Sequence, residues 1–209
     1  WVDIAKGICI VAVVCYYAHT YIGYILPSTG WLDAWSAFAK PFRMPDFFLI
    51  SGLFLAARID KPWAAYLDTK LVHFAYFYIL WMTIQFGLKG PGILMNDGAG
   101  AVLESYVRGF VQPFGTLWFI YMLAVFFAAA KLLRAVPPVL VFAGAALLEI
   151  APIHTEYLLV DEFAARFVYF YAGYLFGARI LGAAKKVEGH ALPALAALAC
   201  WAALNLWLV

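Results

Sequence analysis

The chain has 209 residues, of which 67% are hydrophobic and only 12% are charged, with a formal net charge of +2. Soluble domains average about 25% charged residues and about half apolar residues, so this composition excludes an ordinary soluble protein and indicates one surrounded by lipid. The sequence has no basic run that would indicate a nucleic-acid partner. The three cysteines lack the spacing of a zinc site or a disulfide framework, so we expect no metal.

The first predicted element is a membrane-spanning helix at the start of the chain. No Asp, Glu, Lys, Arg or Pro occurs from Gly7 to Leu26, a run long enough to cross a bilayer. Asp3 and Lys6 lie at the edge of this run, and His19 lies inside it. A His within lipid needs a partner or a wet cavity, so His19 is either a proton-transfer group or a packing residue bonded to a neighbouring helix.

Seven apolar segments predict an all-α fold, a polytopic membrane helix bundle with about seven spans. They are residues 7–26, 42–57, 71–88, 114–133, 136–151, 163–182 and 191–209. The second and the fifth are short, which indicates broken, tilted or re-entrant helices. No Gly/Ser-rich or Pro-rich linker divides the chain, so we expect a single domain over 1–209. The chain begins without Met and ends inside an apolar run, so we expect it to be truncated at both ends.

The connections between these segments contain most of the polar residues. Residues 27–41 are expected to form a connection at the outer surface, and 62–70 a short interfacial helix that begins at a proline. Residues 89–100 are rich in Gly and predict a loop. Residues 101–111 have apolar residues at helical spacing and predict a helix lying flat on the outer surface.

The distribution of basic residues predicts the orientation. Nine of the 14 Lys and Arg residues fall on the same side as the N-terminus, namely Lys6, Arg58, Lys61, Lys70, Lys131, Arg134, Arg179, Lys185 and Lys186. Loops rich in Lys and Arg stay in the cytoplasm. We therefore expect a multi-pass protein of the cell (inner) membrane with a cytoplasmic N-terminus.

The stretch RMPDFFLISG contains three candidate site residues. Arg43 and Asp46 flank Pro45 and are three residues apart, so they pair if this turn is helical. Ser51 and Gly52 interrupt the apolar run that follows. Such a pair permits close helix packing or a local break of the helix.

Two further candidates lie at the ends of later apolar segments. His73 follows Lys70 closely near the predicted cytoplasmic interface. It is either a simple interfacial His or a contact for a lipid headgroup or an anionic ligand. Trp118 lies near the outer end of its segment, where Trp is ordinarily an interfacial anchor.

Together these stretches resemble the acyltransferase 3 family of integral membrane acyltransferases, most closely its sugar and fucose O-acetylase-like members. The resemblance rests on VDIAKGI at 2–8, RMP at 43–45 running into FFLISG at 47–52, LWF at 117–119 and FVYFYAGY at 167–174, in the family's order. It implies transfer of an acyl group, commonly acetyl, from acyl-CoA as co-substrate, with no tightly bound cofactor. The implied acceptor is a hydroxyl of a glycan, a lipid-linked sugar or a related cell-envelope molecule.

The family pattern places a catalytic His after a basic residue and ten intervening residues. With Lys6 as the basic residue this position is Tyr17, and His19 comes two residues later. Two residues rotate a side chain by about 200° on a regular α-helix, so either a local π-bulge re-aims His19 or the chain is a divergent or inactive member. We expect His19 to be the general base. The candidates for substrate or acyl-CoA binding are Asp3, Lys6, Arg43, Asp46, Ser51, Lys70, His73 and Trp118.

Two other functions stay open at this point. Intramembrane His residues, Ser-Gly breaks and short spans are also features of transporters and flippase-like proteins. Tyr17 at the expected His position is the best argument for an inactive acyltransferase-like subunit. The sequence shows no inverted repeat of the kind common in transporters, and the order of the motifs favours the acyltransferase.

Overall fold

The computed structural model of the chain describes residues 1–26, 30–67, 72–113, 115–187 and 189–208. In these residues it contains helices and turns but no strand, which confirms the all-α class. Among them, three segments are long and apolar enough to cross a membrane, namely Val2–Gly23, Gly115–Ala135 and Leu158–Val187, and two apolar helices are shorter. The chain is a membrane protein, and the expected number of seven spans stays a prediction.

The chain forms two compact units. The terminal unit contains Trp1–Phe54 and Tyr169–Val209, and the central unit contains Leu55–Val168. Helix α8 (Leu158–Val187) contributes residues to both units. The expectation of a single domain stays a prediction, because compactness alone does not show that either unit folds independently.

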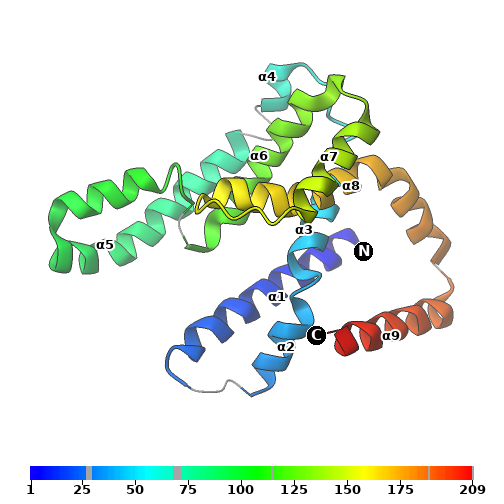
Figure 1. The fold of residues 1–209 in the computed structure, drawn as a ribbon, viewed down its shortest axis with the longest axis horizontal. Helices are drawn as coiled ribbons and strands as arrows, with labels where there is room; N and C mark the ends of the chain where they lie inside the picture. Colours follow the sequence, from blue (N-terminus) through cyan, green and yellow to red (C-terminus); the bar gives the residue numbers. More distant parts are fainter. Residues whose placement is uncertain (27–29, 68–71, 114, 188, 209) are drawn as a thin grey trace. The chain divides into compact units, whose positions relative to one another are not determined.

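Three helices form a hairpin in the terminal unit (Figure 1). Helix α1 (Val2–Gly23) has 22 residues, a rise of about 33 Å that matches the roughly 30 Å hydrocarbon layer. Helices α2 (Trp31–Ala39) and α3 (Arg43–Gly52) follow in series and both pack against α1. Pro41 lies between them, where its missing N–H interrupts the helical hydrogen bonds. The return path along α1 is therefore a broken helix.

This hairpin corrects two expected boundaries. Residues 31–39, expected to be part of a surface connection, form α2, and the expected span 42–57 is helical only to Gly52. Apolar residues recur in WLDAWSAFA at intervals of three and four, so this stretch has an apolar helical face. That face packs against α1 with Ser36 and Ala39 buried. The tertiary contact therefore makes a helix of a stretch whose turn residues at 27–30 suggested a loop.

Helix α3 also lies directly against the second part of α8. A Cβ atom added to Gly52 would overlap the backbone carbonyl of Phe170, and one added to Gly173 would overlap the carbonyl of Leu49. Gly lets two helix backbones approach this closely because it has no side chain. The Ser51–Gly52 interruption is therefore a helix-packing contact.

Helix α9 (Ala191–Leu208) is attached to α2 by a polar and an aromatic contact. The Asn205 side-chain amide donates a hydrogen bond of 2.8 Å to the Phe38 carbonyl oxygen. The Trp201 ring lies 6.0 Å from the Phe38 ring and 5.2 Å from the Phe42 ring, centroid to centroid. These contacts make α9 part of the terminal unit.

The long helix α5 (His73–Arg108) of the central unit folds back on itself (Figure 1). The reversal is at Gly98, whose φ of 85° lies in the region that favours glycine. The expected loop 89–100 is wrong, because the helix continues through Pro91 and turns only after the Asn96-Asp97 pair. One proline removes a single hydrogen bond and kinks a long helix without ending it. The helix expected at 101–111 is present as the second arm of α5.

The rest of the central unit packs around α6 (Trp118–Leu132), which the short helices η2 (Gly115–Leu117) and η3 (Leu133–Ala135) extend at its two ends. Helix α7 (Pro138–Ile150) follows it along the chain. The rings of Phe163 and Phe167, in the first part of α8, lie 5.7 and 5.6 Å from the Phe126 ring of α6. Helix α4 (Trp63–Tyr66) is tied to α6 by the Tyr66 hydroxyl, which donates 2.8 Å to the Phe127 carbonyl. Burial raises the pKa of Tyr66 above its ordinary value, so this hydroxyl remains a protonated donor.

Candidate functional site

The hairpin of the terminal unit brings together four side chains that we call the hairpin cluster. Tyr16 and His19 lie three residues apart on α1 and so share one face of that helix. Asp33 comes from the first turn of α2, and Arg43 is the first residue of α3. Because α2 and α3 run back along α1, their polar residues meet the C-terminal half of α1.

His19 is held by a carboxylate on the neighbouring helix. Its Nε2 atom lies 2.8 Å from Oδ1 of Asp33, with the two side chains 30% and 47% exposed. The other ring nitrogen, Nδ1, is buried and has no hydrogen-bond partner among the described residues. The imidazole is therefore fixed at one nitrogen and unengaged at the other. This arrangement suits a group that accepts or donates a proton.

Arg43 places a positive charge on the same face of α1. Its guanidinium carbon lies 3.7 Å from the centroid of the Tyr16 ring, a cation–π contact, and its Nη1 atom is 3.5 Å from the Ser36 carbonyl oxygen. The side chain is half-buried. A guanidinium that packs on an aromatic ring is well oriented to bind an anion or to stabilise a developing negative charge.

The chain matches the acyltransferase 3 family model, which describes an acyltransferase domain, over residues 1–209. The chain belongs to the acyltransferase 3 family. It is similar to the inner membrane protein YcfT of Escherichia coli strain K12, with 27% identity over 234 residues. The alignment covers all of this chain but only 64% of the length of YcfT. No solved structure matches the chain.

The acyltransferase 3 pattern on α1 can now be compared with its geometry. Helix α1 is α-helical without interruption from Val2 to Gly23, so the π-bulge considered for His19 is not present. His19 reaches α2 from a regular helix, while Tyr17 lies about 200° away around the axis. The ring of Tyr17 lies 5.4 Å from that of Tyr16. His19 therefore meets its carboxylate partner without any deformation of α1. Of the two expectations for the shifted His, this leaves a divergent or inactive member of the family.

The other candidates of the terminal unit lie outside the hairpin cluster. Asp3 and Asp46 are exposed, and the Lys6 ammonium is 5.9 Å from the centroid of the Phe54 ring. The Ser51 hydroxyl donates 2.8 Å to the Phe47 carbonyl in its own helix. Ser51 follows Arg43 by eight residues, about 12 Å along α3, so it is remote from His19 along the hairpin.

The remaining candidates belong to the central unit or are not described. His73 begins α5, is exposed, and has its ring 4.8 Å from the Phe77 ring. Trp118 begins α6, and the Arg166 guanidinium lies 5.4 Å from its ring centroid. Lys70 lies outside the described residues. Of the predicted site residues that the structure describes, it thus brings His19 and Arg43 into the hairpin cluster.

Sequence reasoning missed Asp33. It is the only acidic residue between Asp3 and Asp46, and it lies in the first stretch after the His19 helix. Because a membrane His needs a partner, this isolated carboxyl was the available signal. Its significance depended on the stretch being a helix that packs on α1, which the turn residues before it concealed.

Lys131 was also missed, because a Lys near the end of a span usually extends to the interface. Its side chain is only 1% exposed. Its ammonium donates hydrogen bonds to the carbonyl oxygens of Ile59 and Lys61, the latter at 2.6 Å. It also lies 5.5 and 5.1 Å from the ring centroids of Trp63 and Tyr66. Lys131 therefore joins α6 to the 59–66 segment.

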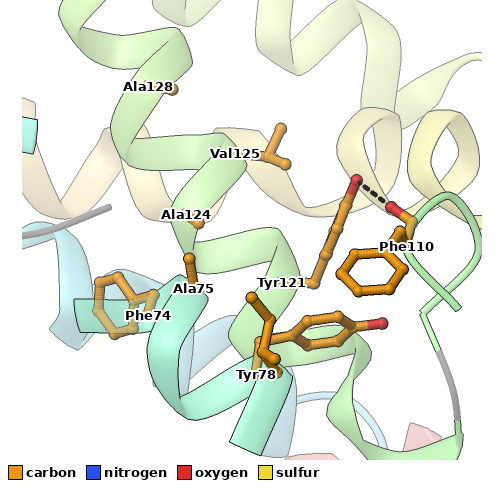
Figure 2. Close-up of a pocket in the computed structure, with 9 residues that line it drawn as sticks. Phe74, Ala75, Tyr78, Phe110, Tyr121, Ala124, Val125 and Ala128 are labelled. Carbon is orange, nitrogen blue, oxygen red and sulfur yellow. Dashed lines mark hydrogen bonds between the residues drawn. The ribbon is translucent and has the colours of Figure 1, made fainter. Parts of the chain in front are cut away.

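The central unit contains an apolar cavity of about 300 Å³ between α5 and α6 (Figure 2). It is lined by Phe74, Ala75, Tyr78, Ile79, Phe110, Tyr121, Ala124, Val125 and Ala128. The two tyrosine hydroxyls are engaged, with Tyr78 donating to the Gly109 carbonyl and Tyr121 donating 3.3 Å to the Phe110 carbonyl. This lining offers no group for proton transfer at neutral pH, so this cavity is not a candidate for the acid–base step.

Proposed function

We propose that the full-length protein is an integral membrane O-acyltransferase that uses His19 as its general base. It moves an acyl group, in the first instance acetyl, from acyl-CoA to a hydroxyl of a glycan or lipid-linked sugar of the cell envelope. The family match over residues 1–209 supports acyl transfer. The assignment of the base rests on the His19 imidazole of α1, whose Nε2 atom is bonded to Asp33 of α2. Tyr16, three residues before His19 on the same helix, contacts Arg43 with its ring.

The proposed step is a single acyl transfer. The acceptor hydroxyl oxygen attacks the thioester carbonyl carbon while the His19 imidazole takes the hydroxyl proton. The C–O bond forms, the C–S bond breaks, and the proton passes to the departing CoA thiolate. The products are the O-acyl acceptor and free CoA, and His19 returns to its neutral form.

Arg43 would act on the charge that develops during this step. The tetrahedral intermediate carries a negative oxygen, and a preorganised cation beside it is worth most where water is excluded. Stacking on Tyr16 fixes the guanidinium on the face of α1 that bears His19. The CoA phosphates need further cations, and Lys6 of the terminal unit is a proposed contact from the predicted orientation.

The proposed location is the inner membrane with the N-terminus in the cytoplasm. YcfT, to which the chain is similar, is named an inner membrane protein. Three segments that are long and apolar enough to cross a membrane support this location, and the excess of basic residues on the N-terminal side supports this orientation. A cytoplasmic N-terminus would place Lys6 on the side from which acyl-CoA arrives.

The proposed function predicts that His19→Ala abolishes acyl transfer. Membranes containing the full-length protein would be supplied with radiolabelled acetyl-CoA, and label in glycans and lipid-linked sugars would be counted at equal protein levels. Loss of the base should lower transfer about 10²–10⁴-fold. Tyr17→Phe removes the hydroxyl at the family's His position and is expected to retain transfer, because that side chain lies on another face of α1.

Two results would contradict this proposal in different ways. Labelling by His19→Ala at the wild-type rate would place the base elsewhere. No labelling by the wild type with acetyl-CoA or longer acyl-CoAs would instead favour a transporter or an inactive member of the family.

A further inference from the structure

We propose that Asp33 is the positioning residue of this site, and that it fixes His19 as the tautomer whose Nδ1 atom accepts the proton. The catalytic part of this inference rests on the proposed function. The tautomer itself does not, because it is a property of the resting protein.

The first step is the direction of the hydrogen bond between the two side chains. An ionised carboxylate can only accept hydrogen bonds, so the 2.8 Å contact requires Nε2 of His19 to be the donor. In a neutral imidazole with a hydrogen on Nε2, the lone pair is on Nδ1. The contact with Asp33 therefore selects which ring nitrogen can act as a base.

The second step is the state of Nδ1 itself. This atom is buried and has no partner among the described residues, although the His19 side chain as a whole is 30% exposed. A buried polar atom without a partner is unusual in proteins, and catalytic groups are one recognised reason for it. The hydroxyl of an acceptor substrate that reaches Nδ1 would donate the missing hydrogen bond to it.

The third step is the rigidity of the carboxylate. Asp33 is on a helix, and α2 is held against α1 by buried Ser36 and Ala39. A partner on a packed helix keeps a catalytic imidazole oriented better than one on a loop. The carboxylate also faces the cation that His19 becomes after it takes the proton, as in other His–Asp pairs.

The kinetic test uses Asp33→Asn, a change that keeps size and removes charge. An amide can either accept from Nε2 or donate to it, so it no longer enforces the productive tautomer. In Ser-His-Asp enzymes the same change lowers kcat about 10⁴-fold, and we expect a loss of at least about 10²-fold here. The KM for acetyl-CoA should change little, and Asp33→Glu should recover part of kcat.

Ala34→Asn is the matched control, because it places the same amide on the exposed neighbouring position of α2. It is expected to leave transfer within about twofold of the wild type, because Ala34 is exposed and lies outside the hairpin cluster. An equal kcat loss in Ala34→Asn would trace the effect to the stability of α2 and would overturn the positioning role. Full activity of Asp33→Asn in a protein that needs His19 would overturn it as well, while leaving the proposed function intact.

A second measurement is independent of activity. ¹⁵N spectra of histidine-labelled full-length protein, with the His19 signals identified by their loss in His19→Gln, report which ring nitrogen carries hydrogen. We expect hydrogen on Nε2 in the wild type and a mixture of tautomers in Asp33→Asn. A wild-type His19 with hydrogen on Nδ1 alone would overturn the inference even if no acceptor were ever found.

Discussion

Gly173→Ala is expected to prevent stable packing of α3 against α8. The new methyl group would overlap the Leu49 carbonyl, a backbone atom that cannot move without moving α3 itself. Overpacking of a core costs about 1–3 kcal/mol where side chains can adjust, and a collision with backbone should exceed this range. The measurement is the apparent Tm and the monodisperse yield of the full-length protein in detergent.

Gly182→Ala is the control on the same helix. A Cβ atom at Gly182 meets nothing within 4 Å, so this change should be neutral or should stabilise α8 by about 0.5–1 kcal/mol through helix propensity. Equal stability of the Gly173 and Gly182 variants would show that α3 and α8 are not in backbone contact. Gly52→Ala should behave like Gly173→Ala, because its methyl group would overlap the Phe170 carbonyl.

Lys131→Met is expected to destabilise the central unit strongly. It keeps the length of the side chain but leaves the Ile59 and Lys61 carbonyls without the donor they now share. Ile59 is buried, and a buried carbonyl that loses its partner is costly, particularly in a protein surrounded by lipid. We expect an apparent Tm about 5–10 °C lower, together with faster proteolysis of the 55–62 segment.

The same substitution at an exposed lysine provides the comparison. Lys185, in the last turn of α8, is exposed, and Lys185→Met should leave the Tm within about 1–2 °C. Unchanged stability of Lys131→Met would mean that the 59–66 segment is held by the Tyr66–Phe127 bond and ring contacts alone. In that case the buried ammonium would need another explanation.

The segments most accurately predicted from the sequence are those defined by hydrophobicity alone. The charge-free run 7–26 is contained almost entirely in α1, and the segment 114–133 corresponds to Gly115–Ala135. The hydrocarbon layer favours helices in such segments, because every backbone N–H and C=O group inside the layer must be hydrogen-bonded within the helix. Their existence therefore depends little on what the rest of the chain does.

The segments predicted wrongly are those whose conformation depends on neighbours. Gly and Pro in 89–100 suggested a loop, but the helix persists through Pro91 and reverses at Gly98 alone. The Phe86 and Tyr106 rings, 5.3 Å apart, and the Thr83 and Tyr106 hydroxyls, 3.0 Å apart, hold the two arms together. Such contacts between residues distant in sequence overrode the local signals.

The candidate site shows the same division. His19 and Arg43 were identified from the sequence because a His and an Arg next to lipid are unusual wherever they point. Their partners Asp33 and Tyr16 were not, because an Asp after a turn and a Tyr in a span are ordinary residues. Only the antiparallel path of α2 and α3 along α1 makes these pairs visible.

The sequence by itself determined that the chain is an all-α membrane protein, which family it resembles and which side chains can carry chemistry. Composition and hydrophobic runs are local properties, and an apolar segment forms a helix in lipid because its backbone groups bond within the segment itself. The tertiary structure alone decided which carboxylate holds His19, which nitrogen is left unengaged and which glycines join α3 to α8. Those pairings require a break at Pro41 and close backbone packing, so they arise only when segments distant in sequence fold against one another.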